Sequence, residues 1–372
     1  MIIISKHIPL GKPFFGNEEV EAVRNTLESG WVAQGPRTEQ FEKKLSTYCD
    51  AKFGIAVNSC TSALHLSLLV SGIAEGDRIL VPDFTFLATG NVILHVGAEP
   101  KLIDIDLDSF CLDVDSIEEN IDERVKLIFP VHAFGYPADI PELNKIAGKH
   151  DIRVIEDAAL AIGSMINCCK IGSFRNLTCF SLQGRKIMTT GEGGMIVLDD
   201  EGTATDLRAL RSQGMYKNTK RGNGSLPIFK KLGFSYRLSD IQASIGLEQL
   251  KRIENFIERR NYLAKYYKDS IEDKRLNVVV PNPPKNIRHN YQSYVVLVKR
   301  NRNKIITNLK NDGVESTIGT YSLSSQPLFK RYKKECPNSI YAFTHSIALP
   351  MYHELKEADI DYIIKSLATS LP

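Results

Sequence analysis

The segment around Lys186 is the first part of the sequence that suggests chemistry. Glycines stand at positions 191, 193 and 194 just after it, and glycine allows positive φ angles and close approach to a ligand or strand. Arg185 and Ile187 exclude a Walker A loop, which needs Gly before its lysine and Ser or Thr after it. The turn is also not the dinucleotide motif G-x-G-x-x-G. Taken alone, the pattern also fits a surface lysine at a hairpin.

A second segment, ending in Glu156 and Asp157, changes that interpretation. It is an apolar run from Arg153 that ends in two carboxylates, and small residues follow at once. An acid at the carboxyl end of a buried parallel strand lies where ligands enter open α/β sheets, although either carboxylate could instead cap a helix. Together, Asp157 and Lys186 supply what a pyridoxal phosphate enzyme needs, namely a carboxylate to keep the pyridine nitrogen protonated and an amine to form a Schiff base.

The elements that must position these residues alternate between strands and helices over the first 250 residues. Short β-rich runs, several of them apolar throughout, predict strands buried on both faces. Helical segments separate most of these runs, so an α/β fold with a mainly parallel sheet wrapped by helices is expected. The predicted strands are residues 53–57, 78–81, 101–105, 126–131, 152–155 and 195–198.

Helices are expected at both ends of this sheet-forming region. Asn17 is predicted to cap a helix with Val20, Val23 and Leu27 on one face, and Thr38 to cap a second helix. After Ser239, a long helical stretch leads to a strand at 294–298 and two further helical patterns. We therefore expect a large domain over residues 1–250 and a small C-terminal α/β domain over 251–372.

Composition and charge exclude several classes of protein. The chain has 372 residues, 43% hydrophobic and 24% charged, which is close to the globular average. A net charge of +3 gives no electrostatic case for nucleic acid or a membrane surface, and the basic stretch 217–221 is expected to be a solvated loop. No apolar run approaches the roughly 18 residues of a membrane span, so a cytoplasmic location is predicted. Seven cysteines without C-x-x-C and eight scattered histidines predict no metal.

Ordered blocks along the chain resemble the DegT/StrS-type (DegT/DnrJ/EryC/StrS) nucleotide-sugar aminotransferases. The central blocks are E-D-A-A (156–159), F-S-x-x-x-x-K (180–186) and T-G-E-G-G (190–194). Blocks at 31–36, 57–65, 82–89, 131–135, 233–242 and 349–352 follow in family order, so the resemblance covers residues 8–370. It implies a fold-type I pyridoxal 5′-phosphate (PLP) transferase of the aspartate-aminotransferase type, with a mainly parallel seven-stranded sheet in its large domain.

The resemblance also implies roles for individual residues. Lys186 resembles the Schiff-base lysine that also moves a proton between cofactor and substrate, and Asp157 resembles the partner of the pyridinium nitrogen. Phe86 stands where an aromatic ring stacks on the cofactor. The phosphate is expected at a turn that opens a helix, whose N–H groups favour an anion. The expected phosphate contacts are Ser59, Cys60, Thr61 and Ser181.

By the same resemblance, Ser235 and Arg237 complete the cofactor site of a partner subunit, which implies a homodimer with shared active sites. An ordinary ion pair at a helix start is the other interpretation of Arg237. The weaker placements toward the substrate are Trp31, Gln34, His132 and Tyr321. The chain departs from many relatives at Cys60, where they have Gly, at Leu160, where they have a polar residue, and at Ser235, where they have Asn.

The implied activity is a PLP-dependent transamination that alternates between PLP and pyridoxamine phosphate. L-glutamate is the implied amino donor, and a nucleotide-linked keto-sugar is the acceptor. A 4-keto-6-deoxy sugar feeding surface-polysaccharide or O-antigen synthesis is expected, with a 3-keto-sugar nucleotide or a non-catalytic regulatory relative as alternatives. Lys186 stands where related sugar dehydratases have His, which disfavours dehydration. An NAD-dependent oxidoreductase is disfavoured because no strand precedes G-x-G-x-x-G.

Overall fold

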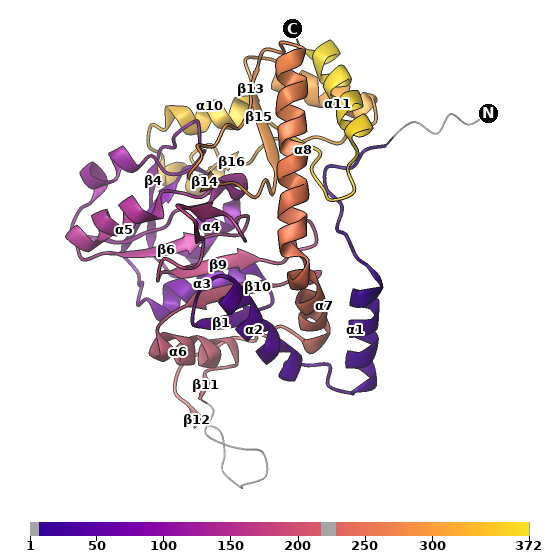
Figure 1. The fold of residues 1–372 in the computed structure, drawn as a ribbon. Helices are drawn as coiled ribbons and strands as arrows, with labels where there is room; N and C mark the ends of the chain where they lie inside the picture. Colours follow the sequence, from indigo (N-terminus) through magenta and orange to yellow (C-terminus); the bar gives the residue numbers. More distant parts are fainter. Residues whose placement is uncertain (1–6, 217–227, 372) are drawn as a thin grey trace.

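A seven-stranded sheet forms the centre of the computed structural model, which describes residues 7–216 and 228–371 (Figure 1). Its strand order is β1-β10-β9-β6-β5-β2-β4. β10 is antiparallel to both of its neighbours, and the other neighbouring pairs are parallel. The predicted mainly parallel sheet is therefore confirmed. The strands are β1 (Phe53–Val57), β2 (Arg78–Pro82), β4 (Glu99–Ile103), β5 (Val125–Ile128), β6 (Arg153–Asp157), β9 (Leu177–Ser181) and β10 (Gly194–Leu198).

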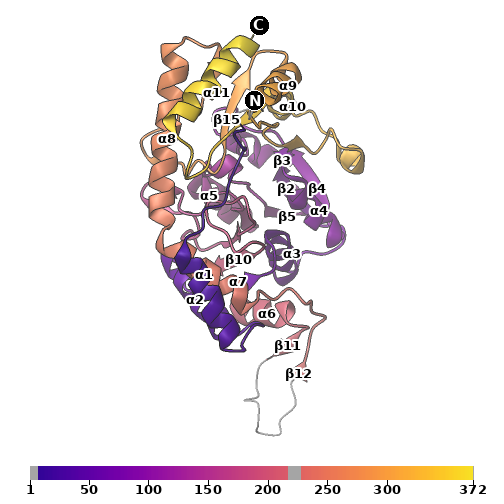
Figure 2. The same ribbon diagram turned by 90° about the vertical axis from the view of Figure 1, so that its right-hand side faces the viewer.

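The strands are buried on both faces because helices cover the sheet on each side (Figure 2). In β6, Val154 joins one hydrophobic cluster and Ile155 the other, as the alternation of side chains along a strand requires. One face packs against α2 (Pro36–Tyr48), α5 (Ile140–Lys149) and α7 (Asp240–Lys251). The other face packs against α3 (Cys60–Val70), α4 (Leu87–His95) and α6 (Glu201–Arg211).

The strand β9 was missed by the sequence prediction. Its sequence, LTCFS, mixes small polar and apolar residues, yet four of its five residues are buried between β6 and β10. β4 also begins two residues earlier than expected, and Ile105 forms only an isolated bridge with Leu112. The prediction missed β9 and the start of β4 because pairing with neighbouring strands, and not local hydrophobicity, determines where these strands form.

The apolar face predicted for the first helix, α1 (Asn17–Glu28), is largely exposed. Val20 and Leu27 are 56% and 54% exposed, whereas Glu19 is buried and accepts a hydrogen bond from Gln249 on α7 at 2.8 Å. Asn17 is the first helical residue, and the glycine before it occupies the cap position. Polar contacts therefore attach this helix to the body of the protein, and its apolar stripe faces outward.

The second helix, α2, also begins earlier than predicted. Thr38 lies inside the first turn and does not cap the helix, which starts at Pro36. Asp240 takes over the capping role from a distant position, because its Oδ1 accepts from both the N–H (2.9 Å) and the Oγ1 (2.7 Å) of Thr38. A carboxylate at a helix N-terminus also interacts favourably with the helix dipole.

The C-terminal part is built on the long helix α8 (Ile253–Asp273), which follows α7 after a break at Arg252 (Figure 1). An antiparallel sheet of β13 (Val278–Val279), β15 (Tyr294–Val298) and β17 (Ser346–Leu349) packs with helices. Three helices follow β15, one more than predicted: α9 (Arg302–Asn311), α10 (Pro337–His345) and α11 (Glu357–Ser370). The division at residue 250 stays a prediction.

Short strands complete the described chain: β3 (Phe84–Thr85), β7 (Met165–Ile166), β8 (Cys169–Lys170), β11 (Met215–Tyr216), β12 (Ile228–Phe229), β14 (Ile287–Arg288) and β16 (Tyr321–Ser322). The predicted solvated loop at 217–221 lies outside the described residues. Across residues 7–216 and 228–371, no helix is long and apolar enough to cross a membrane.

Candidate active site

A cavity of about 480 Å³ lies at the carboxyl edge of the sheet. β6 and β9 end there, and because β10 runs in the opposite direction its first residue, Gly194, lies at the same edge. The C-terminal part closes the cavity with Gln292, Gly319 and Met351, among other residues. Many of the predicted site residues line it together: Ser59, Cys60, Thr61, Phe86, His132, Asp157, Ser181 and Lys186.

One wall of the cavity is the N-terminus of α3. Ser59 caps this helix, and its Oγ accepts from the N–H of Ser62 at 3.1 Å. The N–H groups of Cys60 and Thr61 have no acceptor among the described residues. Unpaired N–H groups and the helix dipole together make a site for an anion, and Ser181 adds a hydroxyl to the same cavity.

The glycine-rich turn after Lys186 lets β10 approach this helix end. A Cβ atom on Gly194 would lie 2.5 Å from the carbonyl of Ser59 and 2.7 Å from the nitrogen of Cys60. Gly191 has a φ of +84°, which a side chain would strain. The expected positive φ is therefore confirmed, and the close approach is made to the start of a helix and not to a strand.

We expect Gly194→Ala to destabilise the protein by about 1–3 kcal/mol, as overpacking does. The methyl group would push the Ser59–Cys60 peptide out of place, so affinity for an anion at this turn should fall as well. Urea unfolding and PLP titration measure the two effects. Gly148→Ala is the matched control, since a Cβ at Gly148 meets nothing within 4 Å. Equal stability of the two variants would contradict the close approach.

Asp157 is the last residue of β6 and is only 4% exposed. Its Oδ2 accepts from the hydroxyl of Thr89 at 2.7 Å, and its Oδ1 accepts from the N–H of Ala159 at 3.1 Å. Burial raises the pKa of this carboxyl above its usual value, although the hydrogen bond from Thr89 opposes the shift. A buried carboxylate held in this way is suited to pair with a cationic group that enters the cavity.

Lys186 follows β9 by five residues and is partly buried in the same cavity. Burial lowers the pKa of its amine below the usual value, while the negative charge of Asp157 acts in the opposite direction. Its Nζ has no hydrogen-bond or ion-pair partner in the described part of the chain. A desolvated amine without a partner is a good nucleophile, because more of it is neutral at a given pH.

The lowered pKa predicts the pH dependence of amine labelling. Because only the neutral amine reacts, lowering the pKa moves the onset of reaction to lower pH. In cofactor-free protein we expect Lys186 to react half-maximally below about pH 10.4, the pKa of a lysine in a peptide. Competitive labelling followed by mass spectrometry measures this midpoint, with the exposed Lys52 as the internal reference. A midpoint equal to that of Lys52 would contradict the effect of burial.

Phe86 is 62% exposed although it is a large aromatic residue. It lies in the cavity wall, and its ring contacts that of Tyr321 at a centroid distance of 6.3 Å. Tyr321 itself does not line the cavity, and its contact with the site is the one with Phe86. An exposed ring at the edge of a cavity can stack on a flat ligand. Leu160 also lines the cavity and adds an apolar surface there.

Both ring nitrogens of His132 have partners within the protein, and its role toward a substrate stays a prediction. The side chain is completely buried, and its Nδ1 accepts from the N–H of Ala138 at 3.0 Å. The ring proton is therefore on Nε2, which donates to Glu156 at 3.0 Å. The buried carboxylate of Glu156 also accepts from Asn176 at 2.9 Å, so the imidazole is held in one orientation beside the cavity.

The remaining predicted residues do not line this cavity. Trp31 is 53% exposed and donates to the carbonyl of Gln34 at 3.4 Å. Ser235 and Arg237 are exposed as well, and the guanidinium donates to the serine hydroxyl at 2.9 Å. The structure therefore brings together the residues predicted for the cofactor ring and phosphate within one chain. Trp31, Ser235 and Arg237 are left on the surface, and Gln34 is half-buried outside the cavity.

Three residues at the site escaped the sequence prediction of roles. Thr89 lies in the recognised block 82–89. The only feature of the sequence that could have pointed to it is a second threonine, Thr85, four residues earlier, whose hydroxyl it contacts. Glu156 was read as one of two strand-end carboxylates, without its histidine partner. Gln292 comes from the C-terminal part, more than 100 residues from Lys186, and nothing local in the sequence connects them.

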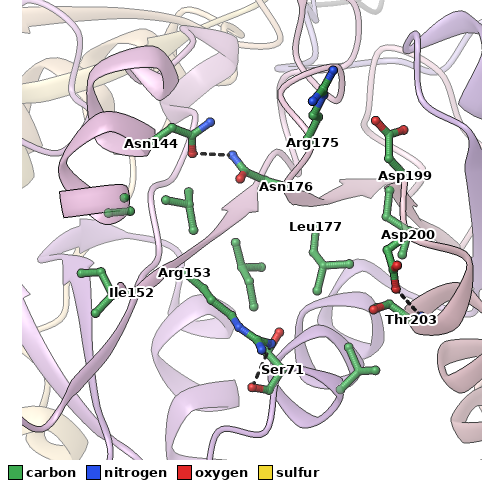
Figure 3. A pocket seen from close by; sticks show the side chains of 16 residues that line it. Ser71, Asn144, Ile152, Arg153, Arg175, Asn176, Leu177, Asp199, Asp200 and Thr203 are labelled. Carbon is green, nitrogen blue, oxygen red and sulfur yellow. Dashed lines mark hydrogen bonds between the residues drawn. The ribbon is translucent and has the colours of Figure 1, made fainter. Parts of the chain in front are cut away.

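A second cavity, of about 380 Å³, lies at the opposite, amino edge of the sheet (Figure 3). Arg153 and Asn176 line it, and Asn176 donates to Asn144 at 3.0 Å. Neither Lys186 nor Asp157 reaches this cavity. We therefore assign the chemistry to the cavity at the carboxyl edge, where ligands bind in open α/β sheets.

The residues of the first cavity fit PLP. Unpaired N–H groups at the start of α3 suit its phosphate, the buried carboxylate of Asp157 suits its ring nitrogen, and the amine of Lys186 suits its aldehyde. A site of this kind at the edge of a mainly parallel seven-stranded sheet is typical of fold-type I PLP-dependent aminotransferases.

Comparison with known proteins identifies the family. Residues 13–368 match the DegT/DnrJ/EryC1/StrS aminotransferase family, to which the chain belongs. It is 34% identical to GDP-perosamine synthase of Caulobacter vibrioides, over 97% of each chain. It is 33% identical to the spore coat polysaccharide biosynthesis protein SpsC of Bacillus subtilis, over 97% of this chain and 96% of SpsC.

The fold and cofactor agree with solved structures. Spr1654 of Streptococcus pneumoniae, assigned as a sugar aminotransferase, has a TM-score of 0.92 and 28% identity, over 98% of this chain and 99% of Spr1654. It has been solved in both PMP and PLP forms. The chain is therefore a PLP-dependent sugar aminotransferase, and the fold expected from the sequence is confirmed.

Proposed function

We propose that this protein transfers the amino group of L-glutamate to a nucleotide-linked keto-sugar. The observation that carries the proposal is the meeting of Lys186 and Asp157 in one cavity with the open N-terminus of α3. GDP-perosamine synthase and SpsC support a sugar nucleotide and a polysaccharide pathway. A 4-keto-6-deoxy sugar is the proposed acceptor, with a 3-keto sugar as the alternative, and a cytoplasmic location belongs to the same proposal.

When bound, PLP supplies an aldehyde that forms a covalent link with an amine and a ring that withdraws electrons. Lys186 is proposed to form that link at rest and, once released, to move the proton at the reacting carbon of the substrate. Asp157 would stabilise a positive charge on the ring nitrogen, and the hydroxyl of Thr89 keeps its carboxylate in position through a hydrogen bond of 2.7 Å. The start of α3 would hold the phosphate, and Phe86 would lie against the ring.

A homodimer with shared sites is part of the proposal. Exposed apolar residues cluster on and next to α1, a pattern that marks protein interfaces: Phe15, Val20, Leu27, Trp31 and Val32. The segment with Ser235 and Arg237 is exposed but adjoins the phosphate turn, because the N–H of Asn58 donates to the carbonyl of Tyr236 at 2.9 Å. A partner subunit would bring its own copies of these two side chains to this edge.

Shared sites predict complementation between inactive variants. Lys186→Ala chains mixed with chains carrying Ser235→Ala and Arg237→Ala should form heterodimers in which one site is intact. We expect up to about half of the wild-type activity per heterodimer, because one of two equivalent sites is restored. Activity assays after co-refolding measure this recovery. Heterodimers as inactive as the parent variants would show that each site is built from one chain.

The test of the proposed function is a screen of UDP-, GDP- and dTDP-linked keto-sugars with L-glutamate. We expect 2-oxoglutarate and an amino-sugar nucleotide in equal amounts, measured by coupled assay and by product mass. A non-catalytic regulatory protein would bind PLP but would release no 2-oxoglutarate in a single turnover with glutamate alone. Release of 2-oxoglutarate without any amino-sugar product from the screened set would overturn the acceptor class.

A further inference from the structure

Two buried amide side chains from one segment hold the loops that carry Lys186 and Asp157. The segment, residues 289–293, precedes β15 in the C-terminal part of the chain. Asn290 is completely buried, and Gln292 is 8% exposed and lines the active-site cavity. Neither residue was assigned a role from the sequence, and buried amides of this kind are kept only where their hydrogen bonds are satisfied.

Gln292 bonds to the backbone on both sides of Lys186. Its Oε1 accepts from the N–H of Ile187 at 2.7 Å, and its Nε2 donates to the carbonyl of Arg185 at 2.9 Å. The N–H of Lys186 itself donates to the carbonyl of Gln183 at 2.8 Å. One side chain from a remote part of the sequence therefore fixes the turn from which the lysine side chain extends.

Asn290 acts on the neighbouring loop, which follows Asp157. Its Nδ2 donates to the carbonyls of Leu160 and Ile162, both at 2.9 Å. Its Oδ1 accepts from the N–H of Gln292 at 2.8 Å, which fixes the position of the second amide. The two amides thus connect the loop after Asp157 to the turn at Lys186.

The long helix α8 anchors the backbone of this segment. Arg260 is 5% exposed, and its Nη1 donates to the carbonyls of Tyr291 and Gln292 at 3.0 and 3.1 Å. The backbone of the segment is therefore anchored to a helix, and its two amide side chains bond to the two active-site loops. Hydrogen bonds from a charged donor are stronger than those between neutral groups.

We propose that Gln292 is a positioning residue. It holds the turn at Lys186 in the place from which the lysine amine can reach the aldehyde of PLP. A lysine side chain has many rotamers, so its reach is set only if its backbone is fixed. A misplacement of about 1 Å in a reacting group can cost about 10²-fold in rate. This inference rests on the proposed role of Lys186 and adds the residue that fixes its backbone.

Gln292→Met tests the proposal, because methionine fills a similar volume and makes neither hydrogen bond. In the cofactor-free protein, we expect the Ile187 amide to exchange with solvent about tenfold faster, measured by mass spectrometry on the peptide 183–190. Attachment of PLP to Lys186, followed by visible absorbance and borohydride trapping, should slow by about tenfold or more. In the loaded enzyme, kcat should fall far more than KM changes. Wild-type rates of exchange and attachment would overturn the proposal.

Gln249→Met is the matched control for loss of a buried amide. Gln249 is 1% exposed, and its Nε2 donates to the carbonyl of Phe14 at 2.9 Å and to Glu19, away from the cavity. We expect this variant to lose stability without faster exchange in the peptide 183–190. An equal change in that peptide would show that Gln292 acts only through general stability, and the proposal would fail.

Gln292→Glu gives a second measurement if Gln292→Met does not fold. It keeps the acceptor for Ile187 but replaces the donor to Arg185 with an oxygen. The Ile187 amide should stay protected while attachment of PLP slows, and attachment at the wild-type rate would overturn the proposal. If wild-type protein attaches no PLP at Lys186, the proposed function fails, whereas exchange of the peptide 183–190 still tests the two hydrogen bonds.

Discussion

Lys186→Ala is expected to abolish the covalent link between the protein and PLP and to lower kcat by about 10⁴-fold or more. Proton transfer by a positioned side chain alone contributes about 10²–10⁴-fold, and this variant also loses the nucleophile that holds the cofactor. Visible absorbance and borohydride reduction with peptide mapping measure loss of the covalent link, and glutamate-dependent turnover measures the loss of kcat. The fold should remain, because the side chain has no hydrogen-bond partner in the described chain.

The control for this experiment is Lys52→Ala, which removes an exposed lysine outside the cavity. It should keep the absorbance, the labelling of residue 186 and the activity of the wild type. Borohydride labelling at a residue other than 186 in the wild type, or turnover by Lys186→Ala within tenfold of the wild type, would remove Lys186 from its proposed role.

Asp157→Asn should weaken PLP binding by about 10²- to 10³-fold, because it leaves a cationic ring without its buried partner. Loss of one member of a buried ion pair costs about 3–5 kcal/mol. The asparagine has nearly the same shape, so the contact with Thr89 can persist and the fold should be kept. The rate of proton removal from the substrate should also fall, since an uncharged ring withdraws electrons less strongly. Equilibrium dialysis of PLP and the pH dependence of the bound cofactor's absorbance measure both effects.

Asp83→Asn is a closely matched control. Asp83 directly follows strand β2 at the same edge of the sheet, is completely buried, and has a pKa raised by burial. Its oxygens accept from the N–H of Ser324 at 2.6 Å and the hydroxyl of Ser322 at 2.7 Å, and it does not line the cavity. It should lower stability without changing PLP affinity. Near-wild-type kinetics and affinity in Asp157→Asn would contradict its pairing with the ring nitrogen.

Local patterns in the sequence predicted most strands of the sheet and one edge of the site, although they missed β9. Strands buried on both faces need continuous apolar runs, so β1, β2 and β6 could be found directly. Asp157 was placed at the ligand-binding edge because it ends a buried strand, whereas Lys186 was paired with it from the chemistry of PLP. The glycines after Lys186 predicted a close approach of the backbone, and Gly194 lies close to the backbone of Ser59 and Cys60.

Only the tertiary structure decided which partners each side chain meets. Helical periodicity predicted an apolar stripe on α1, but Val20 and Leu27 lie at the surface because polar contacts attach that helix to α7. His132 was expected to face a substrate, yet Glu156 and a backbone N–H occupy both of its ring nitrogens. Gln292 is 105 residues from Ile187 in sequence. The periodicity of apolar residues indicates only which local element a segment forms. Hydrogen-bond partners depend on how the folded chain brings segments together that are distant in the sequence.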